Sequence, residues 1–113
     1  MIIESNVNLI NIVVMNILEN ACIFSVNYND RVTITTRNGN GVAYIQIKDQ
    51  GVGIEPELLG NIFDPYVRCS NKSTGSGLGL YLAMKAVKMI DGNITATSKV
   101  NCGSEFLVMI PVE

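Results

Sequence analysis

Residues 16–24 read NILENACIF and place two asparagines, Asn16 and Asn20, four positions apart. The surrounding run, residues 9–24, is almost entirely apolar, and its spacing predicts a helix over residues 8–25. Side chains four positions apart lie on the same face of a helix. Because a buried amide without a hydrogen-bond partner costs about 1–3 kcal/mol, the pair needs partners, either within the fold as a structural cap or in a ligand.

The composition indicates one globular domain that spans residues 1–113. Hydrophobic residues make up 48% of the chain and charged residues 16%, which excludes a disordered protein. The net charge of −2 argues against a general nucleic-acid binder. No apolar stretch reaches the roughly 18 residues of a membrane span, so we expect no direct contact between this domain and a membrane.

The cysteine and histidine content limits the available chemistry. The cysteines, Cys22, Cys69 and Cys102, are odd in number and form no CxxC motif, which indicates free thiols in a reducing, cytoplasmic location. The chain contains no histidine. Imidazole catalysis, histidine metal sites and phosphohistidine on this chain are therefore excluded.

The remaining sequence predicts two hairpins separated by helices. The first hairpin has its turn at residues 38–41 (NGNG). Pro56 suits the first turn of a short helix, and Gly92 suits the stop of a longer one. The predicted elements are strands over residues 31–37, 42–49, 94–98 and 106–112, helices over 55–62 and 78–90, and a loop over 65–77. This order predicts an α+β two-layer sandwich, with one mixed sheet and three helices on one face.

The stretch DQGVGI, residues 49–54, ends a predicted strand with a carboxylate followed by glycines. The carboxylate of Asp49 can accept a hydrogen bond from an exocyclic amine such as that of adenine. Gly51 and Gly53 would let a flat ring approach the backbone closely. The alternative interpretation is purely structural, a strand followed by a tight turn.

The stretch GSGLGL, residues 75–80, precedes a predicted helix. The free amides and the dipole at a helix N-terminus favour an anion, and glycines let phosphates approach the backbone. The stretch is neither a dinucleotide fingerprint nor a P-loop, because Leu80 replaces the last glycine and the chain has no GKS or GKT. Residues 65–90 hold no acidic residue, and within them Arg68 and Lys72 are the predicted anion-binding side chains. A flexible hinge is the alternative.

Four motifs in one order make the sequence similar to the bacterial sensor histidine kinases. NILENA (16–21) resembles their N box, DQGVGI (49–54) their first glycine box, IFDPY (62–66) their F box, and GSGLGL (75–80) their second glycine box. The resemblance runs over residues 8–111 and implies the catalytic, ATP-binding domain of such a kinase. It also implies the Bergerat fold, which gyrase, mismatch-repair and heat-shock chaperone ATPases share.

The resemblance implies roles for individual residues. Asn20 would give its side-chain oxygen to the Mg²⁺ that bridges the ATP phosphates, because Mg²⁺ takes hard oxygen ligands and keeps several waters. Asn16, one turn earlier, would bind a phosphate oxygen or a metal-bound water, and these two asparagines are the implied catalytic residues. The other implied nucleotide contacts are Asp49, Gly51, Gly53, Ile54, Arg68, Lys72, Gly75, Ser76, Gly77, Leu78, Gly79, Leu80 and Ser104.

The identity of Asn16 predicts the type of reaction. ATP-hydrolysing relatives, and the anti-sigma-factor serine kinases, typically carry a glutamate at this position as a general base. The amide of Asn16 cannot take up a proton at neutral pH. Glu19 is a poor substitute for the base, because it lies about 100° around the helix from Asn20. A neutral imidazole needs no base, so the resemblance implies transfer of the γ-phosphoryl group of Mg-ATP to a histidine. That histidine would lie on a separate dimerisation domain, in two-component signalling with a response regulator downstream.

Two departures from the family pattern leave alternatives open. Ile23 occupies the position of a lysine that commonly contacts phosphate, which lowers the expected ATP affinity. The sequence lacks the strand that usually precedes the N-box helix. It also lacks the two-helix segment with the acceptor histidine. We therefore expect this chain to be a piece of a longer kinase, and that full-length kinase can be membrane-anchored. One alternative is a nucleotide-binding module without catalysis. The other is an ATPase of the gyrase–chaperone type, against which Asn16 argues.

Overall fold

The computed structural model describes residues 7–23, 32–51, 53–65 and 78–111. Its elements are α1 (Val7–Ile23), β1 (Thr33–Gly39), β2 (Val42–Lys48), α2 (Pro56–Leu59), α3 (Gly79–Met89), β3 (Asn93–Lys99) and β4 (Gly103–Pro111). Most of them lie within a few residues of the predicted elements. The largest differences are at the end of α2, which stops at Leu59 and not at residue 62, and at the start of β4, which begins at Gly103 and not at residue 106.

The four strands form one sheet in the order β1-β2-β4-β3. All pairings among the described strands are antiparallel, so the predicted mixed character of the sheet is wrong for these strands. The reason is the position of β4, which lies between the parallel strands β2 and β3 and pairs with both. Residues 1–6, which precede α1, are outside the described residues.

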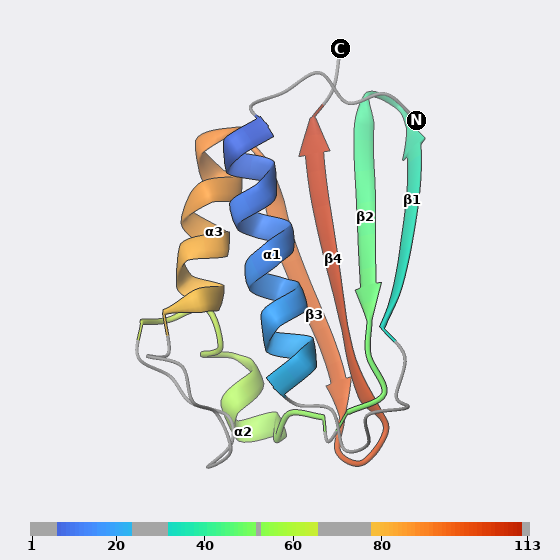
Figure 1. Cartoon of the computed structure of the whole chain (residues 1–113), viewed down its shortest axis with the longest axis vertical. Coiled ribbons are helices and arrows are strands. Elements are labelled where there is room, and N and C mark those ends of the chain that lie inside the picture. Colours follow the sequence, from blue (N-terminus) through green and yellow to red (C-terminus); the bar gives the residue numbers. More distant parts are fainter. Residues whose placement is uncertain (1–6, 24–31, 52, 66–77, 112–113) are drawn as a thin grey trace.

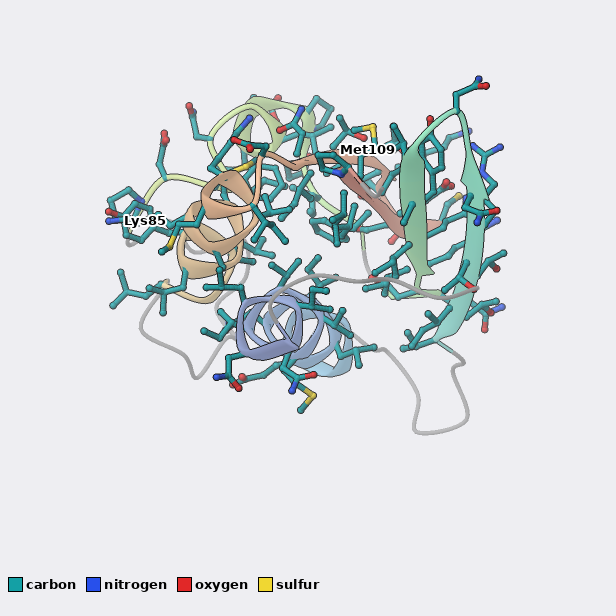
Figure 2. The ribbon with its side chains drawn as sticks, turned by 90° about the horizontal axis from the view of Figure 1, so that it is seen from above. Lys85 and Met109 are labelled. Carbon is teal, nitrogen blue, oxygen red and sulfur yellow. The ribbon has the colours of Figure 1, made fainter. Side chains whose placement is uncertain are left out.

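The helices form a second layer on one face of the sheet (Figure 1). Helices α1 and α3 run antiparallel and side by side, and the short α2 lies below α3 in this view. Figure 2 shows the two layers from above, with Lys85 of α3 pointing away from the sheet. The predicted two-layer α+β fold is therefore confirmed.

The core lies between the two layers. From α1 it receives Val13 and Ile17, which are fully buried and four residues apart, as expected for one helical face. From the sheet it receives every second residue of β2 and β4, as expected for strands with one covered face. The buried hydrophobic residues of the sheet are Ala43, Ile45, Ile47, Ile94, Phe106, Val108 and Ile110. Each large side chain among them contributes about 1.5–3 kcal/mol relative to an exposed position.

Strand β1 lies at the edge of the sheet, outside the cover of the helices. All of its residues are exposed. The helix layer extends only as far as its partner β2. The large hydrophobic side chain of Ile34 in β1 is therefore 48% exposed. The cross-strand neighbours Arg37 and Tyr44 pack together, with the guanidinium carbon 4.6 Å from the ring centroid.

The end of α3 differs from the prediction in one residue. The left-handed position is taken by Asp91 (φ 59°), and Gly92 follows it. The Asp91 and Gly92 N–H groups donate to the carbonyls of Lys88 and Val87, at 3.2 and 2.8 Å, which is a Schellman motif. Gly92 is needed here for space, because a Cβ atom would lie 2.5 Å from the Met109 carbonyl oxygen and 2.7 Å from Val87 Cγ2.

We expect Gly92→Ala to lower the free energy of unfolding by about 1–3 kcal/mol, because the added methyl group overpacks the junction of α3 and β4. Gly60→Ala is the matched control, since a Cβ atom there would meet nothing within 4 Å. The control should change stability by less than about 1 kcal/mol. Urea unfolding of both variants measures the difference, and equal losses would contradict this account of Gly92.

Candidate functional site

Asp49 follows the last residue of β2 and is only 3% exposed. Its backbone N–H donates to the Ser104 carbonyl at 2.9 Å. Its side-chain Oδ1 accepts the N–H of Gly51 at 2.9 Å, as in an Asx turn, and the N–H of Ser104 at 3.1 Å. Because Oδ1 is bonded to two backbone groups of the protein, a ligand amine would use the other oxygen, Oδ2.

Ser98 connects three segments around this carboxylate. Its Oγ accepts the Ile54 N–H at 2.7 Å, donates to the Gly103 carbonyl at 3.0 Å, and lies 2.8 Å from Ser104 Oγ. The sequence prediction included Ser104 but missed Ser98. The sequence could have indicated Ser98, because it lies on the same face of β3 as Ile94, where an apolar residue would be expected.

Gly53 packs against the turn between β3 and β4. Its φ is +77°, and a Cβ atom would lie 2.2 Å from the Lys99 carbonyl oxygen, so only glycine fits. The next residue, Ile54, is 2% exposed and belongs to the core. On the side where a Cβ atom would stand, backbone rather than a ligand occupies the space at Gly53.

The N-box motif and the second glycine box meet at the start of α3. Asn16 Nδ2 donates to the Ile12 carbonyl at 2.7 Å, one turn earlier in α1. Asn16 Oδ1 lies 3.3 Å from the place that a Cβ atom on Gly79 would take. One N–H of this amide thus donates within α1, and its oxygen lies beside the first residue of α3.

The N-terminus of α3 has the features of an anion site. No described side chain caps it, and its first turn holds no acidic residue. Its cap residue is Leu78, whose carbonyl accepts the first helical bond from Leu82 at 2.8 Å. Figure 1 shows the start of α3, the end of α1, α2 and the turn between β3 and β4 at one end of the molecule. The backbone amides of α3 therefore point into the region where the predicted motifs converge.

The F-box residues anchor this end of the molecule. Ile62 is 2% exposed and joins the core. The ring of Phe63 packs edge-on against Phe106, with centroids 6.3 Å apart and planes at 86°. Such a pair contributes about 0.5–1.5 kcal/mol beyond its buried area.

Several predicted site residues lie outside the described residues. These are Arg68, Lys72, Gly75, Ser76 and Gly77. The backbone of Asn20 belongs to α1, but its side chain is not among those described.

Metal and membrane features are few in the part of the chain that is described. It contains no group of three or more His, Cys, Asp or Glu side chains that could hold a metal ion. A magnesium site made of one amide oxygen, phosphates and water does not need such a group. No helix in the same residues is long and apolar enough to cross a membrane.

An open hollow of about 340 Å³ lies at the same end of the sheet. Lys48, Thr97 and Glu105 are opposite one another in the register, at positions that point away from the helices. The hollow is lined by Lys48, Asp49, Thr97, Ser98, Lys99, Cys102, Gly103, Ser104 and Glu105. The hollow therefore combines Asp49, Ser98 and Ser104 with residues on the outer face of the sheet.

Comparison with known families decides the family to which the chain belongs. The model of the histidine kinase-, DNA gyrase B- and HSP90-like ATPases matches residues 5–113. The chain belongs to this ATPase family. The resemblance predicted from the four motifs is confirmed, because the chain's relatives in the family are sensor histidine kinases.

Two of these relatives are the autoinducer 2 sensor kinase/phosphatase LuxQ of Vibrio vulnificus and the histidine protein kinase SaeS of Staphylococcus epidermidis. LuxQ is 33% identical over 92% of this chain, and SaeS is 40% identical over 81%. The chain spans only 13% of the length of LuxQ and 28% of that of SaeS. The similarity therefore concerns their ATPase-family domain and not the whole proteins.

Solved structures of this ATPase family have the same fold. The catalytic domain of histidine kinase ThkA has a TM-score of 0.81 at 27% identity, and the match covers 97% of this chain and 70% of that domain. The mycobacterial sensor histidine kinase MprB has a TM-score of 0.87 at 24% identity, over 98% of this chain and 77% of MprB. Full-length ShkA, solved in complex with AMPPNP, has a TM-score of 0.85 at 22% identity, over 97% of this chain and 23% of ShkA.

We expect Asp49→Ala to destabilise the fold by about 2–4 kcal/mol, because two buried backbone N–H groups lose their acceptor. Asp49→Asn keeps an oxygen at the Oδ1 position and should cost less than about 1 kcal/mol. Thermal or urea unfolding of both variants distinguishes them. Equal stability of Asp49→Ala and the parent chain would show that the carboxylate does not hold the turn.

Proposed function

We propose that this ATPase-family domain transfers the γ-phosphoryl group of Mg-ATP to a histidine on another domain. The observation that carries the proposal is the position of Asn16, whose amide oxygen faces the N-terminus of α3 beside Gly79. An amide in this place cannot act as a general base, so activation of water or of a serine hydroxyl is disfavoured. A neutral imidazole already offers a lone pair and needs no such base.

Adenine is proposed to bind at the end of the sheet. The exocyclic amine would donate to Asp49 Oδ2, because Oδ1 already accepts the N–H groups of Gly51 and Ser104. Ser104 would lie beside the same edge of the base, since its backbone is bonded to the carboxylate. The low exposure of Asp49 favours this role, because a hydrogen bond to a buried charged acceptor is stronger than one in water.

The phosphates are proposed to bind at the N-terminus of α3. Phosphate oxygens would accept hydrogen bonds from the backbone N–H groups of Gly79, Leu80 and residues 75–77. Arg68 and Lys72 would supply the positive charge that the family usually gains from a lysine at the position of Ile23.

The donor set in α1 fits a hydrated magnesium ion. Asn16 Nδ2 is bonded to the Ile12 carbonyl, which leaves the amide oxygen directed toward the phosphate region. Oxygen is the ligand type that Mg²⁺ requires. When bound, Mg²⁺ would neutralise charge on the phosphates, with Asn20 as its protein ligand. Asn16 would orient a phosphate oxygen or a metal-bound water, and the chain itself would act by positioning.

The acceptor must belong to another domain, because this chain contains no histidine. We propose a histidine-bearing dimerisation domain of the same kinase as the direct partner and a response regulator downstream, at a cytoplasmic location. The relatives LuxQ and SaeS are a sensor kinase/phosphatase and a histidine protein kinase, which supports partners of this kind. A nucleotide-binding module without catalysis is the second candidate, and the apolar residue Ile23 favours it.

We expect Asp49→Asn to weaken Mg-ATP binding by about 5- to 150-fold, because the introduced NH₂ group opposes the adenine amine. Asp91→Asn is the matched control, since Asp91 is exposed at the far end of α3 and asparagine accepts its φ of 59°. Titration calorimetry measures both affinities. Unchanged affinity in Asp49→Asn would remove this residue from adenine recognition.

We expect the chain alone to hydrolyse ATP very slowly and to remain unlabelled by [γ-³²P]ATP. With the two-helix histidine domain of its own kinase, it should label that histidine, because positioning then completes the reaction. Asn20→Ala should abolish the transfer, whereas Asn11→Ala, at an exposed position of α1, should not. Acid-labile label on the acceptor is the readout. Rapid hydrolysis would indicate an ATPase, and tight ATP binding without transfer would indicate a binding module.

A further inference from the structure

We propose that the exposed apolar surface of α1 and α3 beside the phosphate region is the docking surface for the acceptor domain, and that it binds an apolar surface next to the acceptor histidine. The docking patch consists of Ile12 and Met15 of α1 and Leu82 of α3. The proposal rests on the proposed function, because it concerns where the histidine-bearing partner of that reaction binds.

Exposed apolar side chains gather around the contact between Asn16 and Gly79. Among the described residues, six large hydrophobic side chains are exposed, namely Ile12, Met15, Ile34, Leu82, Met89 and Val100. The three that form the docking patch are 41%, 61% and 46% exposed and lie within about one helical turn of Asn16 or Gly79. A single exposed apolar residue is normal, but a group of them beside a site is typical of an interaction surface.

The antiparallel packing of the two helices places Ile12 and Leu82 at the same level. Ile12 lies one turn before Asn16, and its carbonyl accepts the Asn16 Nδ2 hydrogen at 2.7 Å. Leu82 lies three residues after Gly79. Because α1 and α3 run side by side in opposite directions (Figure 1), both residues lie on the same side of the Asn16–Gly79 contact. The distance from that contact is about 4–6 Å along the helix axes.

The outer face of α1 has little of the charge that an ordinary surface helix carries. Asn8, Ile12, Met15 and Glu19 are exposed and follow one another at intervals of four, three and four residues, so they form one stripe. Glu19 is the only charged residue in the sequence of this helix. The centres of protein interfaces are depleted in charged residues and enriched in methionine, so this stripe suits contact with another protein.

The proposed reaction determines which protein binds there. The γ-phosphoryl group would lie at the N-terminus of α3 beside Asn16, and the attacking nitrogen must come within about 3–3.5 Å of its target. A domain that brings its histidine so close must also contact the surface around the phosphates, which includes the docking patch. A second copy of this chain cannot supply the nucleophile, because the chain contains no histidine.

Phosphoryl transfer at varied concentrations of the histidine domain of the same kinase measures docking. Met15→Asp should raise the KM for that domain by at least about tenfold, because docking would bury an unpaired carboxylate. Met15→Leu keeps the apolar surface and should retain the parent KM. Met89→Asp is the matched control, since Met89 is 72% exposed but lies about 15 Å along α3 from Gly79. The affinity for Mg-ATP, measured by calorimetry, should be the same in all four proteins.

The kinetic results separate the docking patch from the proposed reaction. If the parent chain transfers the phosphoryl group, an unchanged KM in Met15→Asp would overturn the docking patch and leave the proposed function intact. An equal rise in Met89→Asp would also overturn the patch, because the effect would then not be local. Weaker Mg-ATP binding by Met15→Asp would do the same, since the residue would act through the nucleotide site or the fold.

Photo-crosslinking tests the patch without relying on transfer. The photoreactive residue p-benzoylphenylalanine replaces Met15 in one variant and Met89 in another, and each variant is irradiated with the histidine domain and Mg-ATP. Crosslinking to that domain from position 15 but not from position 89 is the expected result. Crosslinks from position 15 only to a second copy of the chain would overturn the proposal. Crosslinking to the histidine domain without any transfer would support the docking patch and overturn the proposed reaction.

Discussion

The end of the sheet depends on one oxygen atom, Oδ1 of Asp49. It accepts the N–H groups of Gly51 and Ser104, so a single side chain fixes both the turn after β2 and the beginning of β4. Burial of a carboxylate is costly, and charge-assisted bonds from backbone amides offset that cost. Because the carboxylate is planar and held at Oδ1, the position of Oδ2 is fixed as well. The proposed adenine contact thus follows from an interaction that the fold itself requires.

The packing of α1 against α3 is the second constraint on the site. The two helices lie side by side, and two of the buried residues of α3, Ala83 and Ala86, are small. As a consequence, Asn16 reaches the first residue of α3, Gly79. The proposed phosphate region is therefore formed by two segments that are distant in sequence. Its chemistry depends on the amide at this position, because a carboxylate would bring a base and a negative charge.

Local patterns predicted most elements but not their pairing or burial. Helix α1 and the first hairpin depend on spacing and turn residues within a few positions, so the sequence contains them directly. The antiparallel pairing of the described strands depends on the position of β4 between β2 and β3, which is set by contacts between residues far apart in the sequence. The exposure of Ile34 depends on how far the helix layer extends. The α3 stop is formed by Asp91 with Gly92, and Gly92 is required by contact with β4.

The sequence by itself determined the family, the order of the elements and the chemistry of Asn16 and Asp49, because motif spacing and residue type are local properties. Only the tertiary structure decided which groups share hydrogen bonds. It placed Ser98 in hydrogen-bonding contact with Ile54 and Ser104. It also made Oδ1 of Asp49 an acceptor for backbone N–H groups. These bonds join residues up to 55 positions apart. Such partners are selected by the packing of the whole chain, and no short sequence pattern records them.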